Sequence, residues 1–388
     1  MTDRILVGTR KGTFVVAKGR GGWKPNLAGH AGMGVNFVAR DPHSGALWAA
    51  LGLGHWGAKL SRSDDDGQSW ADASQVKYPA GARYLGHSMP SEDSTEIPGP
   101  TQIKPATLLK LWVLAFGGPG HIYVGTIPGG LFVSKDGGAR FELNGPLWNH
   151  ESRGGDLSDG NGSGDTHWFG TPASESGEFA PGIHSILVDP RDPDRVLVAI
   201  STAGVLETRD GGKTWRSRNK GMLMDYQPDP AAEWGHDPHA IELCPGQPDH
   251  LWQQNHCGVF YSADGAATWK KVSHPHQGVH FGFPVAVDAK QGATAWVVPG
   301  KADMQRMAID GALFVARTQD GGASWESLRE GLPQKNAYDV VLRHALSNSG
   351  DRLAFGSTTG NLYVSEDRGE SWRAAANNLP PIYSVRFG

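Results

Sequence analysis

The sequence predicts an all-β fold, a seven-bladed β-propeller with four-stranded blades, from three observations. A Ser/Thr-x-Asp-x-Gly-x-Ser/Thr-Trp pattern recurs six times, and the intervals between copies suit one blade each. Short apolar runs of strand length lie upstream of every copy. Each end of the chain carries part of one further unit. A repeat period of this size is typical of propellers and solenoids.

Each copy of the pattern predicts a hairpin turn that stabilises itself. The Asp and Ser/Thr side chains can hydrogen-bond to the nearby backbone, and the Gly allows a conformation that other residues resist. The closing Trp carries an apolar area that one hairpin cannot bury alone. We therefore expect the six central acids to be structural. They are Asp65, Asp136, Asp210, Asp264, Asp320 and Asp367.

The strand-like runs divide residues 1–388 into blades of a single domain. Six units are expected at 35–74, 108–144, 183–220, 239–273, 283–328 and 338–376. The N-terminal residues 4–27 read as second to fourth strands, and residues 382–388 read as a first strand. Pairing these two ends would make the seventh blade and close the ring, which removes exposed sheet edges. Longer loop insertions are expected at 76–106, 147–182, 218–238 and 299–311.

Composition narrows the classes of partner. The net charge of −4 in 388 residues gives no electrostatic case for nucleic acid or an anionic membrane. No apolar run is long enough to span a bilayer, and the N-terminus lacks the apolar core of a secretory signal. Cys244 and Cys257 are too few for a disulfide framework. We expect a cytoplasmic protein with a small-molecule or oligosaccharide substrate, while the oligomeric state stays open.

The repeat resembles the Asp-box, or bacterial neuraminidase repeat, of a β-propeller superfamily. That pattern is seen in sialidases, some cellulose- and xyloglucan-degrading hydrolases, sortilin-like receptors and a photosystem assembly factor. Departures are small, such as Phe141 for Trp and Ala266 for Gly. The resemblance implies that each box lies between the third and fourth strands of a blade, away from the functional face.

The histidines are distributed unevenly between the two faces that this layout defines. The loops joining strands two to three, and one blade to the next, share the face opposite the boxes, and they also receive every long insertion. Long loops on one face of a rigid scaffold are where function usually lies. Four histidines are assigned to the box face, namely His43, His121, His250 and His344. The other twelve are assigned to the opposite face: His30, His55, His87, His150, His167, His184, His236, His239, His256, His274, His276 and His280.

The first residue of each innermost strand should border the central funnel. Alignment of the units places there His184, His239, Tyr338, Tyr383, Asn36, Lys110 and Phe283. Neutral imidazoles in one pocket suit Zn, Fe, Mn, Ni or Cu, so one divalent transition metal is expected on His184, His239, His256 and His236. Asp237 or Glu233 could complete or orient this shell. Two alternatives stay open: acid–base chemistry without a metal, and histidines that only hydrogen-bond around channel water.

Further candidates come from the loops. Catalytic roles are considered for His184, His239, Tyr338, Tyr383, Tyr226 and His167, and substrate binding for Arg83, Arg153, Arg306, Asn36 and Trp168. Calcium is a weaker candidate, because Asp159, Asn161, Ser163 and Asp165 alternate as in the first half of a calcium loop but no Glu closes it.

Three functions are compatible with these patterns. The first is a hydrolase or lyase with a histidine-rich funnel, acting on a glycoside, a uronic-acid-like compound or another small substrate. The second is a non-catalytic binding or assembly scaffold. The third, a sialidase, is implied by the resemblance, but the Phe/Tyr-Arg-Ile-Pro segment that carries its first arginine is absent from the sequence.

Overall fold

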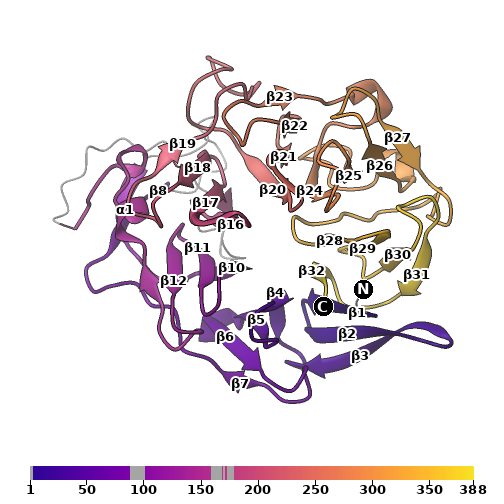
Figure 1. Ribbon diagram of the computed structural model, residues 1–388, viewed down its shortest axis with the longest axis horizontal. Coiled ribbons are helices and arrows are strands. Elements are labelled where there is room, and N and C mark those ends of the chain that lie inside the picture. The colour runs from indigo at the N-terminus through magenta and orange to yellow at the C-terminus, as the bar shows by residue number, and fades with distance from the viewer. Residues whose placement is uncertain (1–2, 88–100, 159–167, 169–170, 173–178) are drawn as a thin grey trace, which may run out of the picture.

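The computed structural model describes residues 3–87, 101–158, 168, 171–172 and 179–388. Seven four-stranded antiparallel sheets stand around a central axis as the blades of a propeller (Figure 1). The predicted fold class is therefore confirmed. The innermost strands of neighbouring blades contact one another around the ring.

The blades are numbered in chain order from the first complete one, and each is given from its innermost to its outermost strand. Blades 1 and 2 are β4 (Gly34–Arg40), β5 (Leu47–Gly52), β6 (Ala58–Ser63), β7 (Ala71–Asp72), and β10 (Lys110–Phe116), β11 (Ile122–Ile127), β12 (Leu131–Ser134), β13 (Glu142–Leu143). Blades 3 and 4 are β16 (Ile183–Asp189), β17 (Asp192–Ile200), β18 (Gly204–Thr208), β19 (Arg216–Ser217), and β20 (Pro238–Cys244), β21 (Gln247–Asn255), β22 (Gly258–Ser262), β23 (Lys270–Lys271). Blades 5 and 6 are β24 (Gly282–Val287), β25 (Ala295–Pro299), β26 (Val315–Thr318), β27 (Glu326–Leu328), and β28 (Leu346–Ser349), β29 (Arg352–Gly356), β30 (Leu362–Ser365), β31 (Arg373–Ala376).

Blade 7 joins the two ends of the chain. It consists of β32 (Ile382–Phe387) innermost, followed by β1 (Arg4–Thr9), β2 (Gly12–Gly19) and β3 (Gly22–Gly29). Val7 pairs with Val385 in the antiparallel register of β1 and β32, and the two termini lie close together in Figure 1. The predicted ring closure is thus confirmed, and neither end of the described chain leaves an unpaired inner edge.

The recurring motifs form the turns between the third and fourth strands. In the first copy, Ser63 Oγ accepts from the Gly67 N–H at 2.8 Å, while Asp65 accepts from the Ser69 N–H at 2.8 Å and from both hydroxyls. These hydrogen bonds, led by the one from the Ser69 hydroxyl, lower the pKa of Asp65 to about 2. The closing Trp70 donates from its indole to the Ala28 carbonyl of blade 7. This turn thus braces itself and the neighbouring blade, so the Asp65 carboxylate is structural.

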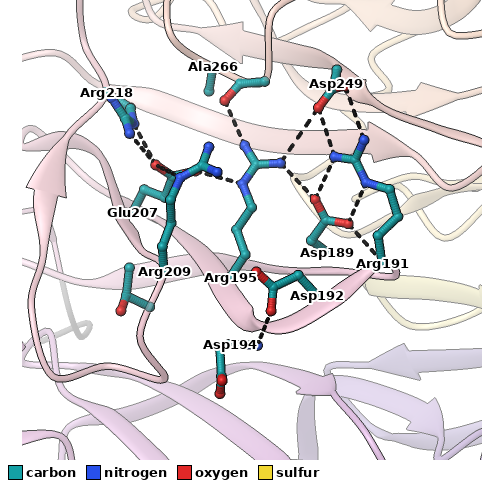
Figure 2. Close-up of polar contacts among 12 residues, drawn as sticks. Asp189, Arg191, Asp192, Asp194, Arg195, Glu207, Arg209, Arg218, Asp249 and Ala266 are labelled. Carbon is teal, nitrogen blue, oxygen red and sulfur yellow. Dashed lines mark hydrogen bonds and ion pairs between the residues drawn. The ribbon is translucent and has the colours of Figure 1, made fainter.

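A network of buried charges joins blades 3 and 4 (Figure 2). Arg195 contacts Asp189 at 2.7 Å and Glu207 at 2.6 Å within blade 3, and all three side chains are almost fully buried. It also donates to the Gly265 carbonyl of blade 4 at 2.6 Å, and Arg191 reaches Asp249 of that blade at 2.7 Å. The network fixes the relative position of the two blades whose innermost strands carry His184 and His239.

The remaining elements lie in the connections between blades and in the loops between second and third strands. Two hairpins, β8 (Arg83–His87) with β9 (Thr101–Pro105) and β14 (Thr171–Pro172) with β15 (Phe179–Ala180), precede blades 2 and 3. The helical turns are η1 (Gly54–Trp56), α1 (Gly145–Trp148), η2 (Glu151–Arg153), η3 (Pro275–Gln277) and η4 (Ile309–Gly311). In the part of the chain that the structure describes, none of these helices has the length and apolar character needed to cross a bilayer.

Candidate functional site

The innermost strands open into a cavity of about 440 Å³ at one end of the central channel. Loops between second and third strands form much of its wall, so it lies on the face opposite the repeat turns. Its size is that of a small-molecule site. Eight residues that the sequence proposed for the funnel or its metal shell line it together: Asn36, Lys110, Asp237, His239, His256, Phe283, Arg306 and Tyr383.

Bulges in the innermost strands turn side chains toward the channel. In six blades the pairing of the innermost strand shifts register near its funnel end. A β-bulge leaves one residue unpaired and redirects its side chain, which is why bulges occur often beside active sites. The shifts fall at Asn36, Trp112, His184, His239, Phe283 and Tyr383.

His239 is held in one orientation and one tautomer. Its Nδ1 lies 2.6 Å from the Gly282 carbonyl oxygen, and because a carbonyl only accepts, Nδ1 must carry a proton. The ring stacks on Phe283 with centroids 4.7 Å apart. Its Nε2 then points at Asp237 Oδ2, 3.3 Å away. Burial lowers the pKa of His239 despite the attraction of Asp237, so the ring tends to stay neutral.

Asp237 and His256 complete a cluster with His239. The Nδ1 of His256 lies 3.7 Å from Asp237 Oδ2, and one donor atom from each of the three residues lies within 4.8 Å of the others. Burial raises the pKa of Asp237, but the neighbouring His239 in its charged form, together with Arg343 and His256, outweighs burial and holds this pKa below its ordinary value. Asp237 is therefore a carboxylate, and the cluster offers two imidazoles and one carboxylate, a ligand set that suits divalent transition metals.

A strained residue supports this carboxylate from blade 3. Thr202 adopts a φ of 59°, a left-handed conformation that is unusual for a β-branched residue. Its backbone N–H donates to Asp237 Oδ1 at 3.3 Å. Backbone strain of this kind gathers at functional sites, where the surrounding structure holds it in place.

Three cationic side chains, Lys110, Arg306 and Arg343, also line the cavity wall. Arg306 pairs with Asp303 at 2.5 Å. Lys110 lies over the Trp112 ring at 5.2 Å, and burial with the nearby Arg343 lowers its pKa to about 8. An amine with this pKa can donate or accept a proton near neutral pH.

His184 lies deeper in the channel than the cluster. It is fully buried, its Nε2 has no hydrogen-bond partner among the described residues, and burial lowers its pKa well below the ordinary value. It lines a smaller chamber of about 160 Å³ with His344, whose Nε2 donates to the His184 carbonyl at 2.6 Å. The metal role predicted for His184 is therefore not supported by position. The box-face assignment of His344 is wrong, since this residue lines the channel.

Three other predicted residues lie away from the cavity. His236 is buried beside the cluster, but its Nε2 is hydrogen-bonded to the Ala232 carbonyl and its side chain does not line the cavity. Tyr338 is 60% exposed, because the innermost strand of blade 6 begins only at Leu346. Tyr226 donates to the Gly235 carbonyl at 2.7 Å, and burial raises the pKa of its phenol, so it supports His256 edge-on rather than acting as a base.

The predicted substrate arginines do not converge. Arg83 is exposed on β8, whereas Arg153 is buried between Trp148 and Trp168 and donates to the Gly129 carbonyl. Only Arg306 lines the funnel. Trp168 is fully buried and donates from its indole to Ser152, so it belongs to the protein interior and not to the cavity wall. His167 and the calcium-loop candidates at 159–165 lie outside the described residues.

Sequence reasoning missed two residues of the funnel, one cation and one histidine that burial keeps neutral. Arg343 and His344 occupy the place in blade 6 that was assigned to Tyr338. The run Val340–Leu342 resembles a strand, but it forms a loop that leads into the channel. Alignment of Arg343-His-Ala-Leu with His184-Ser-Ile-Leu would have found the correct register.

Comparison with known proteins gives partial matches. No family model matches the chain. A stretch of 170 residues, 42% of the chain, is 30% identical to the oligoxyloglucan-reducing end-specific xyloglucanase of Emericella nidulans and covers 19% of that protein. A stretch of 79 residues, 20% of the chain, is 39% identical to the vacuolar protein sorting/targeting protein 10 of Laccaria bicolor and covers 5% of it. The chain thus spans less than a fifth of either relative.

Two solved structures share the architecture. An ancestral GH74 enzyme superposes with a TM-score of 0.55 at 14% identity, over 87% of this chain and 38% of the other. YCF48 from Cyanidioschyzon merolae superposes with a TM-score of 0.53 at 14% identity, over 91% of this chain and 93% of the other. At this identity the likeness concerns the fold, and the fold that these proteins share with the chain is the propeller.

Proposed function

We propose that the funnel is a metal-dependent active site, a hydrolase or lyase site for a small glycoside-type substrate. The proposal depends on one observation: two hydrogen-bond acceptors, His239 Nε2 and the Asp237 carboxylate, face each other. His239 has its proton on Nδ1, so its Nε2 lone pair faces the carboxylate of Asp237 at 3.3 Å. Two lone pairs at this distance repel unless a cation lies between them. Burial disfavours a second proton on His239, and a metal ion supplies the cation instead.

The surroundings of the cluster fit a metal site. A ligating histidine usually donates its other N–H to a carbonyl or carboxylate, as His239 does to Gly282. Asp237 is positioned in turn by the Thr202 N–H. The His256 side chain is 30% exposed, which leaves the funnel side of the cluster accessible. Three protein ligands with one open position are typical of catalytic rather than structural zinc.

The chain's own groups can serve either reaction. A divalent ion on this cluster would supply Lewis acidity and an activated water. Lys110, with a pKa of about 8, can exchange a proton with the substrate, and Tyr383 and Asn36 line the same cavity for orientation. A glycosidase with two carboxylates and no metal needs an acid with a raised pKa, whereas the pKa of Asp237 is lowered.

The substrate class rests on the size of the cavity and on the relatives. A cavity of about 440 Å³ suits one or two sugar units rather than a polymer. The name of the Emericella relative, a xyloglucanase, supports a glycosidic bond as the target.

Metal analysis with matched variants tests the proposal. Purified protein, reloaded after chelation with Zn²⁺, Mn²⁺, Fe²⁺, Ni²⁺ or Cu²⁺, should bind about one equivalent of at least one ion. His239→Ala should lose that ion together with turnover of a panel of short glycosides. His236→Ala is the control, because His236 is a buried neighbouring histidine outside the cavity. Equal metal binding by wild type and His239→Ala would overturn the metal site.

A non-catalytic scaffold is the second candidate, and exposed apolar side chains favour it. Trp56 is 86% exposed and Met304 is 92% exposed, both on loops of the funnel face, as is Tyr338. Such side chains are typical of protein contact surfaces. Turnover by wild type that is lost in His239→Ala would argue against a purely structural role.

A further inference from the structure

One half-buried cation of the funnel has no ion-pair or hydrogen-bond partner within the described protein. Arg343 reaches from the turn before β28 to lie over Trp112 of blade 2 and Phe283 of blade 5, 5.2 Å from each ring centroid. Its Nε is buried without a hydrogen bond. The guanidinium makes neither an ion pair nor a hydrogen bond with any side chain or carbonyl of the described ranges. Buried charges are normally paired, so this exception points to a ligand.

We infer that the funnel seats an oxyanion group of the substrate on Arg343 and Lys110, beside the Asp237–His239–His256 cluster. The inference rests on the proposed function in one respect, because it assumes that the substrate binds in the same cavity. An arginine packed against two aromatic rings is already ordered, so its planar fork is ready for bidentate binding of an oxyanion. Lys110 would add a second, compact positive charge.

The electrostatics of the wall favour an anion. Burial and the nearness of Arg343 lower the pKa of Lys110 to about 8, which shows that the two cations repel each other. Burial likewise lowers the pKa of Arg343 to about 10, even though Asp237 attracts it. An anion between these two groups would relieve the repulsion. Arg306, the third cation of the wall, is already paired with Asp303.

Two kinds of substrate carry the required chemistry. A sugar acid offers a planar carboxylate, and a sugar phosphate offers a tetrahedral oxyanion of higher charge. Both would place the negative group on Arg343 and leave the sugar ring toward the metal cluster. A neutral sugar would cover Arg343 without supplying a counterion, so the seat also discriminates against neutral substrates.

Calorimetric titration of the full chain with four probes tests the seat. The probes are D-glucuronate, its uncharged methyl ester, glucose 6-phosphate and glucose. At least one of the two anions should bind more tightly than both neutral compounds, and the tighter one identifies the oxyanion. Arg343→Gln should lower the affinity for that anion on the order of 10- to 100-fold, the usual effect of losing a charged hydrogen bond. Arg329→Gln is the matched control, because Arg329 lies over Phe314 outside the funnel, and it should leave binding unchanged.

Chelation separates this inference from the metal site. Anion binding that survives chelation and is lost in Arg343→Gln supports the seat whether or not the metal proposal holds. Anion binding that is lost on chelation and unchanged in Arg343→Gln would overturn the seat and assign the anion to the metal. Equal affinity for charged and neutral probes, or no binding of either anion, would also overturn it. A folding defect in Arg343→Gln is recognised by circular dichroism, and Lys110→Met then provides the second test, with a weaker loss of the same anion.

Discussion

Two clusters of charge withdrawn from water lie on different parts of this propeller, one beside a repeat turn and one in the funnel, and they are built differently. In the cluster between blades 3 and 4, Arg195 is enclosed by Asp189, Glu207 and the Gly265 carbonyl. In the funnel, Arg343 lies over two aromatic rings with no acid or carbonyl of the described chain bound to it. In the first cluster the protein itself supplies the ion-pair and hydrogen-bond partners of the arginine, and in the second it does not.

The difference separates structure from function. A fully paired network contributes specificity of packing, and removing one member leaves an uncompensated charge. A partly unpaired cluster costs stability, so its persistence indicates an external partner. Mutations in the first cluster should therefore reduce stability, whereas mutations in the funnel should mainly reduce binding.

The largest expected loss of stability comes from the paired cluster. Glu207→Ala leaves Arg195 and Arg218 without their shared acid and should lower the free energy of unfolding by about 3–5 kcal/mol. Urea denaturation measures this loss. Arg209→Gln, which removes only the exposed partner of Glu207, should cost under about 1 kcal/mol. Similar losses in both variants would contradict the account of this network.

The buried His344 in the channel should make the stability of the protein depend on pH. Burial lowers the pKa of His344 to about 3 in the folded protein, against 6.5 for an ordinary histidine. Between these values the unfolded chain binds more protons, so stability falls as the pH drops below about 6.5. From pH 7 to pH 4.5, His344 should account for roughly 2–3 kcal/mol of this loss. In His344→Asn, the free energy of unfolding measured with urea should fall less between pH 7 and pH 4.5. An equal fall in wild type and variant would refute this account.

A smaller loss is expected beside the metal cluster. Tyr226→Phe removes the hydrogen bond to the Gly235 carbonyl and should lower stability by about 1 kcal/mol. Turnover should persist, because the phenol faces a carbonyl rather than the cavity. Abolished turnover with normal stability would restore Tyr226 as a catalytic acid or base.

The smallest change in stability is expected within the cluster itself. Asp237→Asn keeps an acceptor for the Thr202 N–H but removes the charge that faces His239. Its free energy of unfolding, measured without metal, should change by less than about 1 kcal/mol. Metal affinity should nevertheless drop on the order of 100-fold or more, because a direct ligand is lost. A large loss of stability would instead place Asp237 among the structural charges.

The sequence predicted the fold more fully than the site because repeats report local turns. The hairpin at Asp65 depends on residues within seven positions, so its pattern is visible in one copy and repeated in five more. The meeting of Asp237, His239 and His256 was partly visible, since blades 3 and 4 align closely. The position of Arg343 could have been found by aligning blade 6 with blade 3, but its role depends on Trp112 and Phe283, which lie far away in the chain.

Anomalous diffraction from metal-loaded crystals most directly tests whether the funnel holds a catalytic ion. We predict one peak at the metal's absorption edge, about 2.0–2.2 Å from His239 Nε2, His256 Nδ1 and an oxygen of Asp237. The peak should be absent from crystals of His239→Ala grown in the same solution. A peak at another place, or none beside these three residues in fully loaded wild type, would contradict the account.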